Sequence, residues 1–144
     1  MAGGANYGLD KAYLSAAAIG SAATGPDLVT SYDYFLFVKI SGTAGTTVTP
    51  AAAGDVVLGV AQQRVVTADI NKQPVDVRMY GISKVVAGGT LAFGDKVKSD
   101  AAGKAVVNAV GTLANTAGIV VGAGGASGDL VDVLLTPGGR DAAS

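Results

Sequence analysis

The sequence predicts an all-β fold, and three observations support that prediction. Short runs of β-branched and aromatic residues alternate along the chain with turns rich in Gly, Asp and Ser. The 11 acidic residues are all Asp, which favours turns, whereas Glu, a good helix former, is absent. Helical spacers of the kind that join parallel strands are missing. The chain of 144 residues therefore fits one compact β-barrel or β-sandwich domain.

The central part of the chain gives the clearest strand signals. Residues 34–40 (YFLFVKI) are a dense aromatic and β-branched run, typical of a largely buried strand, and a Gly/Thr turn region follows at 41–46. Residues 56–66 predict a strand with a bulge or bend at Gly59. Residues 75–80 alternate apolar and polar side chains with a period of two, so one face of this strand is expected to be buried.

The remaining strands are shorter and are separated by Gly-containing turns. Gly81 leads into the first of them, and the predicted ranges are 82–86, 96–98, 105–110, 118–121 and 130–135. Residues 136–144 contain Pro, Gly-Gly and small polar residues, so we expect a loose end.

The first thirty-one residues differ from the rest because small side chains dominate them. We interpret this segment as an extended N-terminal arm, in which Asp10 caps a short helix over residues 11–18. The alternatives are a leader without fixed structure in the free protein and a segment that becomes ordered on a partner. The predicted organisation is an arm at 1–31, a β-barrel domain at 32–136 and a flexible tail at 137–144.

One short motif, Gly-Asp-x-Val, occurs three times, beginning at Gly54, Gly94 and Gly128. Glycine can adopt positive φ, and the aspartate side chain can accept hydrogen bonds from nearby backbone amides. Each copy therefore predicts a turn into a strand. Because the spacing is irregular, we interpret the three as equivalent corners of one barrel rather than as units of a solenoid.

Composition excludes several classes of function. With neither His nor Cys, a Ser/His/Asp or Cys/His catalytic centre is impossible, and the commonest metal ligand is missing. The net charge of −1 and scattered basic residues disfavour nucleic acid, and no apolar run approaches the ~20 residues that span a bilayer. We expect no enzymatic activity, no catalytic, metal or cofactor site, and no nucleic-acid or membrane partner.

Three weaker chemical interpretations remain. Asp95 with Asp100, and Asp129 with Asp132, are possible carboxylate pairs, although turn capping is the favoured interpretation. The Gly-rich residues 122–128 lack the third glycine and the following helix of a nucleotide-binding loop, so they predict a hairpin. Residues 91–98 resemble the corner of biotinyl and lipoyl carrier domains, but Lys104 lacks the surroundings of their modified lysine.

A wider resemblance covers about residues 34–135. It rests on GDVVLGVAQQ, then VDVRMYGISKVVAGGTLAFGDKVKSDAAGKAV, then GIVVGAGGASGDLVDVLL. The order of the motifs, a strand ending in Gly-Val-Ala, a Gly-x-x-x-Val strand and two Gly-Asp-x-Val corners, resembles the capsid decoration (cement) proteins of tailed bacteriophages.

This resemblance implies a small β-barrel or β-tulip protein that binds the outer surface of an expanded capsid and holds neighbouring capsomers together. The implied partners are the major capsid protein and further copies of the chain, most often in a trimer. The implied location is the outer surface of the virion, after synthesis in the bacterial host cytoplasm. The alternative is a phage tail, fibre or host-surface binding module, which the 6% aromatic content and the lack of Trp make less suited to sugar stacking.

Apolar side chains outside the core pattern are the candidates for contact with the capsid or another subunit. Two of these candidates, Tyr32 and Tyr34, lie in an aromatic patch with Phe35 and Phe37. This patch is either core or interface. We also expect that a chain without residues 1–31 still folds but binds the shell more weakly. The candidate interface residues are Tyr7, Leu9, Tyr13, Leu14, Tyr32 and Tyr34.

Overall fold

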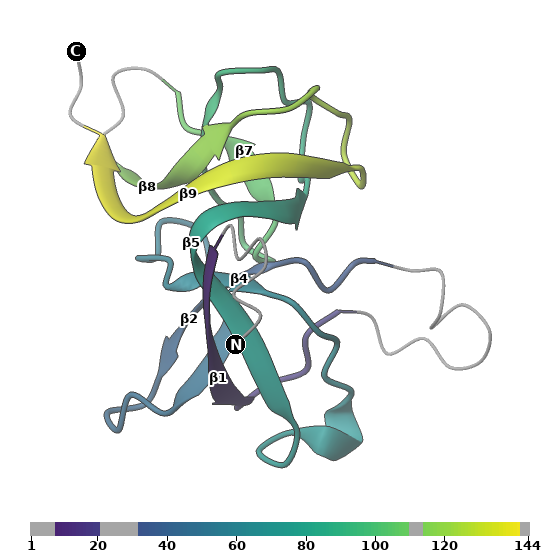
Figure 1. Cartoon of the computed structure of the whole chain (residues 1–144), viewed down its shortest axis with the longest axis vertical. Helices are drawn as coiled ribbons and strands as arrows, with labels where there is room; N and C mark the ends of the chain where they lie inside the picture. The colour runs from purple at the N-terminus through teal and green to yellow at the C-terminus, as the bar shows by residue number, and fades with distance from the viewer. Residues whose placement is uncertain (1–7, 21–31, 110–113, 142–144) are drawn as a thin grey trace, which may run out of the picture.

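Nine strands form one continuous sheet in the computed structural model, which describes residues 8–20, 32–109 and 114–141 (Figure 1). A single 3-10 turn, η1 (Thr67–Asp69), is the one helical element of these residues. The predicted all-β class is therefore confirmed. The strands are β1 (Gly8–Ser15), β2 (Phe37–Ser41), β3 (Thr47–Pro50), β4 (Gly59–Ala61), β5 (Pro74–Val86), β6 (Lys96–Ser99), β7 (Ala105–Val107), β8 (Ala114–Val120) and β9 (Leu130–Asp141).

Five of the strands close into a barrel, the lower lobe of Figure 1. Their order is β1-β3-β2-β4-β5, and β1 also pairs with β5, which completes the ring. The β1–β3 pairing is parallel, at Leu14 with Thr47, while the other pairings are antiparallel. Apolar side chains that alternate along these strands fill the interior. They include Tyr13, Val38, Val48, Ala61, Val75 and Val77.

The other four strands form the upper lobe together with the last part of β5 (Figure 1). Their order is β5-β9-β8-β6-β7. An isolated parallel bridge joins Ala87, which follows β5, to Ala105 at the start of β7, so this half of the sheet curls back toward β5. A second buried cluster fills it. That cluster includes Phe37, Val85, Leu91, Val97, Val120, Val131 and Val133.

β5 belongs to both lobes and bends where they meet (Figure 1). The sequence suggested two strands on either side of Gly81, whereas the structure has one strand of 13 residues. Gly81 has a φ of +91° and pairs with Gly8 of β1 and Leu135 of β9. A positive φ is costly for residues with a Cβ, so glycine permits the strand to change partners without ending.

The predicted helix over residues 11–18 is wrong. Residues 8–15 form β1, in which buried Tyr13 and Ser15 alternate with exposed Ala12 and Leu14. This period of two matches a strand with one buried face. Pairing with β5 provides the backbone hydrogen bonds that a helix would have formed within itself.

Other strand boundaries differ from the sequence-based ranges. β2 begins at Phe37 rather than at residue 34, β4 keeps only three residues of the range 56–66, and β3 was not predicted. β9 continues to Asp141, beyond the predicted start of the loose end. The division into arm, barrel domain and tail remains a prediction, because residues 1–7, 21–31 and 142–144 lie outside the described part of the chain.

Candidate interaction surface

The three Gly-Asp corners have the same geometry, as the sequence predicted. Gly54, Gly94 and Gly128 have φ values of +80°, +85° and +93°. In each corner the aspartate Oδ2 accepts a hydrogen bond from the backbone N–H of the alanine three residues earlier, at 2.7, 2.8 and 2.9 Å. The aspartate N–H donates back to the same alanine's carbonyl in every case. These carboxylates therefore stabilise turns.

The other candidate acids also have structural partners. Asp100 Oδ1 accepts hydrogen bonds from the N–H groups of Ala102 and Lys104, and Asp132 forms an ion pair with Lys84 at 3.2 Å. Within the described ranges, no group of three or more acidic side chains is arranged to hold a metal ion. None of the described residues forms a helix that is long and apolar enough to cross a membrane.

The side chains of the aromatic patch differ in burial, from exposed Tyr32 to fully buried Phe37. Phe37 is fully buried, Phe35 and Tyr34 are partly buried against the core, and Tyr32 is 52% exposed. The rings of Tyr34 and Phe35 lie 4.6 Å apart, and the Arg64 guanidinium lies 5.7 Å from the Tyr34 ring. Tyr32 is thus the member of the patch that is most available to a partner.

The other candidate interface residues have different surroundings. Tyr13 is only 8% exposed and its hydroxyl lies 3.8 Å from the Met79 sulfur, so the barrel itself already buries this ring. Leu14 points outward and is 37% exposed. Leu9 lies in β1 opposite Tyr80, and Tyr7 lies outside the described residues.

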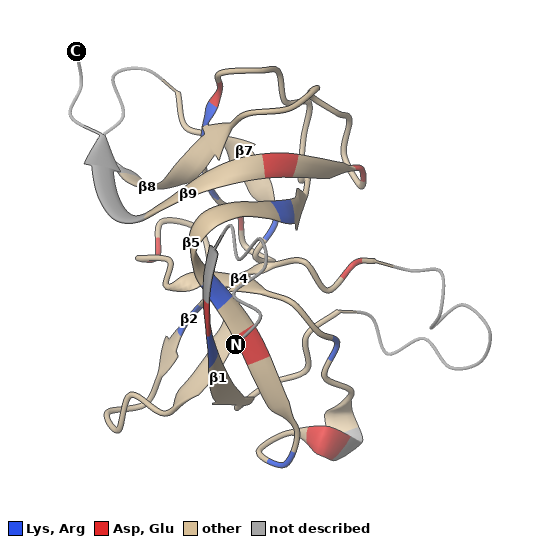
Figure 2. Ribbon diagram, in the orientation of Figure 1, with Lys and Arg blue, Asp and Glu red and all other residues tan. Residues whose placement is uncertain are grey.

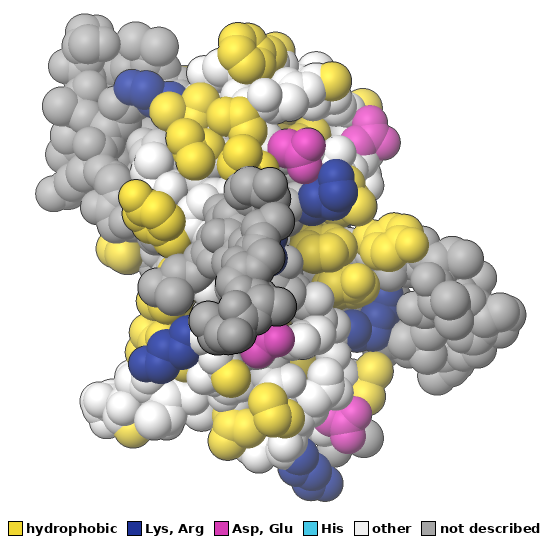
Figure 3. Space-filling model, viewed as in Figure 1, with side chains coloured by type: hydrophobic (Ala, Val, Ile, Leu, Met, Phe, Trp, Pro, Cys, Tyr) yellow, Lys and Arg dark blue, Asp and Glu magenta, His cyan; other side chains and the backbone are white. Residues whose placement is uncertain are grey.

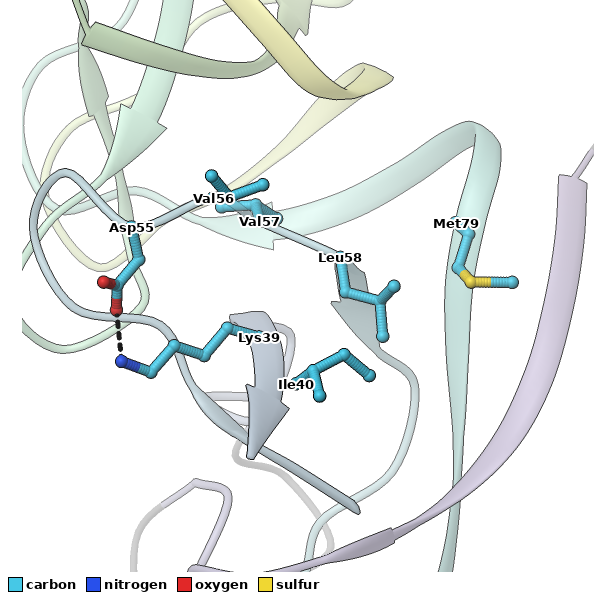
Figure 4. A pocket seen from close by; sticks show the side chains of 7 residues that line it. All are labelled: Lys39, Ile40, Asp55, Val56, Val57, Leu58 and Met79. Carbon is cyan, nitrogen blue, oxygen red and sulfur yellow. Dashed lines mark ion pairs between the residues drawn. The ribbon is translucent and has the colours of Figure 1, made fainter. Parts of the chain in front are cut away.

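An apolar hollow of about 600 Å³ opens beside β2 (Figure 4). Val56, 59% exposed, lies at its rim, where the Lys39 ammonium forms an ion pair with Asp55 at 2.7 Å. The hydrogen bond from Lys39, then that from the Ala52 N–H, lowers the pKa of Asp55 from its ordinary value of 3.8. The lining residues are Lys39, Ile40, Asp55, Val56, Val57, Leu58 and Met79.

A second apolar surface lies where the two lobes meet, and the sequence reasoning did not identify it. Tyr80 is 69% exposed, Ile82 44% and Leu134 40%. Ile82 pairs directly with Leu134, so their side chains share one face of the sheet. The signal was present in the sequence, because Tyr80 occupies the polar, outward phase of the alternation at 75–80. We call Tyr80, Ile82 and Leu134 the junction face.

Ion pairs flank the junction face along β5. Arg78 pairs with Asp10 of β1 at 2.9 Å, and Lys84 pairs with Asp132 of β9 at 3.2 Å. Charges of both signs are scattered over both lobes (Figure 2), and hydrophobic side chains gather over β8 and β9 in the upper lobe (Figure 3). An apolar centre with a mixed polar rim is a common arrangement in protein–protein interfaces.

Comparison with solved structures gives a match that covers most of the chain. No protein-family model matches the chain, and no curated protein matches it. Among solved structures, the chain is similar to the N base of the head fibre gp8.5 of bacteriophage phi29, with a TM-score of 0.62 and 17% sequence identity. The match covers 89% of this chain and 93% of that chain. At this identity the likeness shows a shared fold, which extends over most of both chains.

Proposed function

We propose that this chain is a structural protein of a bacteriophage head and acts as a capsid decoration protein on its outer surface. The fold it shares with the phi29 head-fibre base over 89% of its length is the observation that supports this proposal most directly. The order of Gly-Asp corners and strands, which resembles the decoration family, supports it independently.

The surface of the described residues suits such a role. Apolar side chains are exposed in several separate places, including Tyr32, the junction face and Phe93, which is 75% exposed at a corner. Single apolar anchors give weak contacts, but many copies bound to one shell, each touching more than one capsomer, add up through multivalency. The partners in this proposal are the major capsid protein and further copies of the chain in a trimer.

Among the predicted contact residues whose side chains are described, Tyr32 and Leu14 are exposed, while Tyr34 is partly buried. We assign Tyr32 and Leu14, together with Tyr80, to contact with the shell or with a neighbouring copy. Tyr34 supports Tyr32 from beneath, since their ring centroids lie 6.4 Å apart.

Co-sedimentation with expanded heads assembled without this protein tests the proposal. Wild-type protein should saturate at a fixed multiple of the capsomer number. Double substitution of Tyr32→Ala and Tyr80→Ala should weaken binding by at least tenfold, whereas Lys72→Ala, at an exposed site away from both, should not. A folded wild-type protein that does not bind such heads would overturn the proposal.

A further inference from the structure

Phe93 is an exposed aromatic side chain that its own turn does not require. It is 75% exposed, the largest exposed fraction among the large hydrophobic side chains of the described ranges. The three Gly-Asp corners share one geometry, and the residue before the glycine is Ala53 in the first corner and Ser127 in the third, both exposed. Because small side chains form the same turn, the turn does not explain an aromatic ring at this place. Such a ring is a candidate anchor for a partner.

The second corner holds the backbone of Phe93 in a fixed position. The Ala92 N–H donates to Asp95 Oδ2 at 2.8 Å. The Gly94 N–H donates to the Val120 carbonyl at 2.8 Å, and the Val120 N–H donates to the Asp95 carbonyl at 2.9 Å. These hydrogen bonds attach the corner to β8. An anchor whose backbone is already ordered loses little conformational entropy on binding.

The hollow beside β2 has the size and the character to receive such a ring. Its volume of about 600 Å³ is larger than one aromatic side chain, and Phe93 is not one of its lining residues. Figure 4 shows the ion pair of Lys39 at one end and Met79 of β5 at the other, with Ile40 and Leu58 between them. Ile40 is 37% exposed, so apolar walls face water. Filling the hollow with a ring removes apolar surface of both partners from water.

The charges beside the ring and beside the hollow are complementary. Asp95, two residues after Phe93, has no lysine ion pair among the described residues. At the rim of the hollow, the Lys39 side chain is 39% exposed and forms an ion pair with Asp55. A lysine ammonium has three N–H donors, so Lys39 can bind a second carboxylate while it keeps the first.

We infer that Phe93 of one copy of the chain occupies the hollow beside β2 of a second copy, with Asp95 next to Lys39 at the rim. The two halves of this contact are different surfaces of the same chain, so the contact is head-to-tail. Head-to-tail contacts close into a ring when the rotation between copies permits it. The inference deepens the proposed function and rests on it for the trimer, in which each copy gives one aromatic ring and receives one.

The contact between free copies should be weak. A phenylalanine buries about 150–250 Å², whereas a stable interface buries about 1,000 Å² or more in total. Neighbouring positions on a shell raise the effective concentration of one copy beside the next, which strengthens a weak contact. The test in solution therefore needs a method that detects weakly populated complexes.

Intermolecular paramagnetic relaxation in NMR spectra tests the contact without heads. A nitroxide is attached to Ala92→Cys, whose thiol is unique because the chain has no cysteine. This protein is mixed with isotope-labelled wild type at about 1 mM, where contacts with a Kd near 1 mM are populated. The methyl signals of Ile40, Val56 and Leu58 should show a relaxation enhancement at least tenfold larger than those of Val107, which is 41% exposed on β7.

Substitutions on either partner should remove this enhancement. Phe93→Ala in the spin-labelled protein should reduce it at least tenfold, as expected when an anchor is truncated. Val56→Asp in the isotope-labelled protein should also reduce it, because it places a charge at the apolar rim. Tyr80→Ala in the spin-labelled protein removes another exposed ring, is the matched control and should leave the enhancement unchanged. Amide shifts that stay unchanged away from each substitution show that the variants are folded.

Three outcomes would overturn the inference. They are an enhancement that persists with Phe93→Ala, an enhancement confined to residues 92–94, which means that two Phe93 corners face each other, and the absence of any enhancement. The result is separable from the decoration role. Wild-type protein that binds heads but shows no enhancement refutes the contact alone, whereas enhancement without binding to heads refutes the decoration role alone.

Discussion

A single carboxylate oxygen joins β2 to the first Gly-Asp corner: Asp55 Oδ2 lies 2.7 Å from Lys39 Nζ and 2.7 Å from the backbone nitrogen of Ala52. Asp95 and Asp129 make the same backbone hydrogen bond in their own corners. No lysine ion pair is found for these two among the described residues, so Asp55 has a second interaction that its equivalents do not share.

Replacing Asp95 tests the backbone hydrogen bond of a corner that has no lysine ion pair among the described residues. Asp95→Ala removes the acceptor of the Ala92 N–H and should lower the free energy of unfolding by about 1 kcal/mol, as for other side chains that cap backbone amides. Asp95→Asn keeps an acceptor oxygen and should cost less. Urea denaturation measures both, and equal losses for Asn and Ala would show that the hydrogen bond is not what stabilises the corner.

The ion pair at Asp55 should make stability depend on pH. The Lys39 ammonium lowers the pKa of Asp55 in the folded state below 3.8, so its stabilisation is complete well above that value and is lost as the pH falls through the folded-state pKa. Because both side chains are partly exposed, water screens the pair and its contribution is about 0.2–1 kcal/mol.

Comparison of wild type with Asp55→Asn isolates this contribution, since the amide preserves the turn acceptor but not the charge. The difference in unfolding free energy should be largest near pH 7 and should shrink toward zero below pH 3.8. A difference that stays constant from neutral to acidic pH would exclude the ion pair as its cause.

Two glycines should differ in their tolerance of alanine. A Cβ at Gly59 would overlap the backbone oxygen of Arg78, at the point where β4 pairs with β5. At Gly94 no atom lies within 4 Å of such a Cβ, and the cost is only that of the positive φ. We expect Gly94→Ala to cost about 1 kcal/mol and Gly59→Ala several times as much. Thermal denaturation that ranks them in the opposite order would contradict this packing.

The features that could be predicted from the sequence are the local ones. Each Gly-Asp corner closes through hydrogen bonds within four residues, so the residue types alone indicate the turn. The alternation of Val75 and Val77 with polar neighbours likewise shows which face is buried.

The features that could not be predicted depend on distant partners. β1 is a strand because its residues pair with distant ones, such as Tyr13 with Val75, more than sixty residues away. The local pattern that predicted a helix after Asp10 contains no information about that pairing. Tyr7, Leu9 and Tyr13 looked alike as apolar residues in a small-residue segment, yet Tyr13 is core. Tyr80 was assigned to the outward phase of its strand, but a single alternation does not show that Leu134 lies beside it on the same face.

The position of β1 changes what truncation should do. Residues 8–15 pair with both β3 and β5, so removal of residues 1–15 opens the barrel and exposes its core. We expect this variant to unfold or to lose most of its cooperative thermal transition, whereas the sequence-based expectation is that a chain without residues 1–31 still folds. A sharp transition near the wild-type midpoint would show that β1 is dispensable.

Tyr13 and Tyr32 form a matched pair for locating the boundary between core and interface. Tyr13 is 8% exposed within the barrel, so Tyr13→Ala should lower the free energy of unfolding by about 3–5 kcal/mol through lost burial and the cavity that remains. Tyr32 is 52% exposed, so Tyr32→Ala should change it by about 0.5 kcal/mol or less. Urea denaturation of both variants gives the two values under one condition. If Tyr32→Ala is the more destabilising, the aromatic patch is core throughout, and its outer ring is not available to a capsid or to another copy.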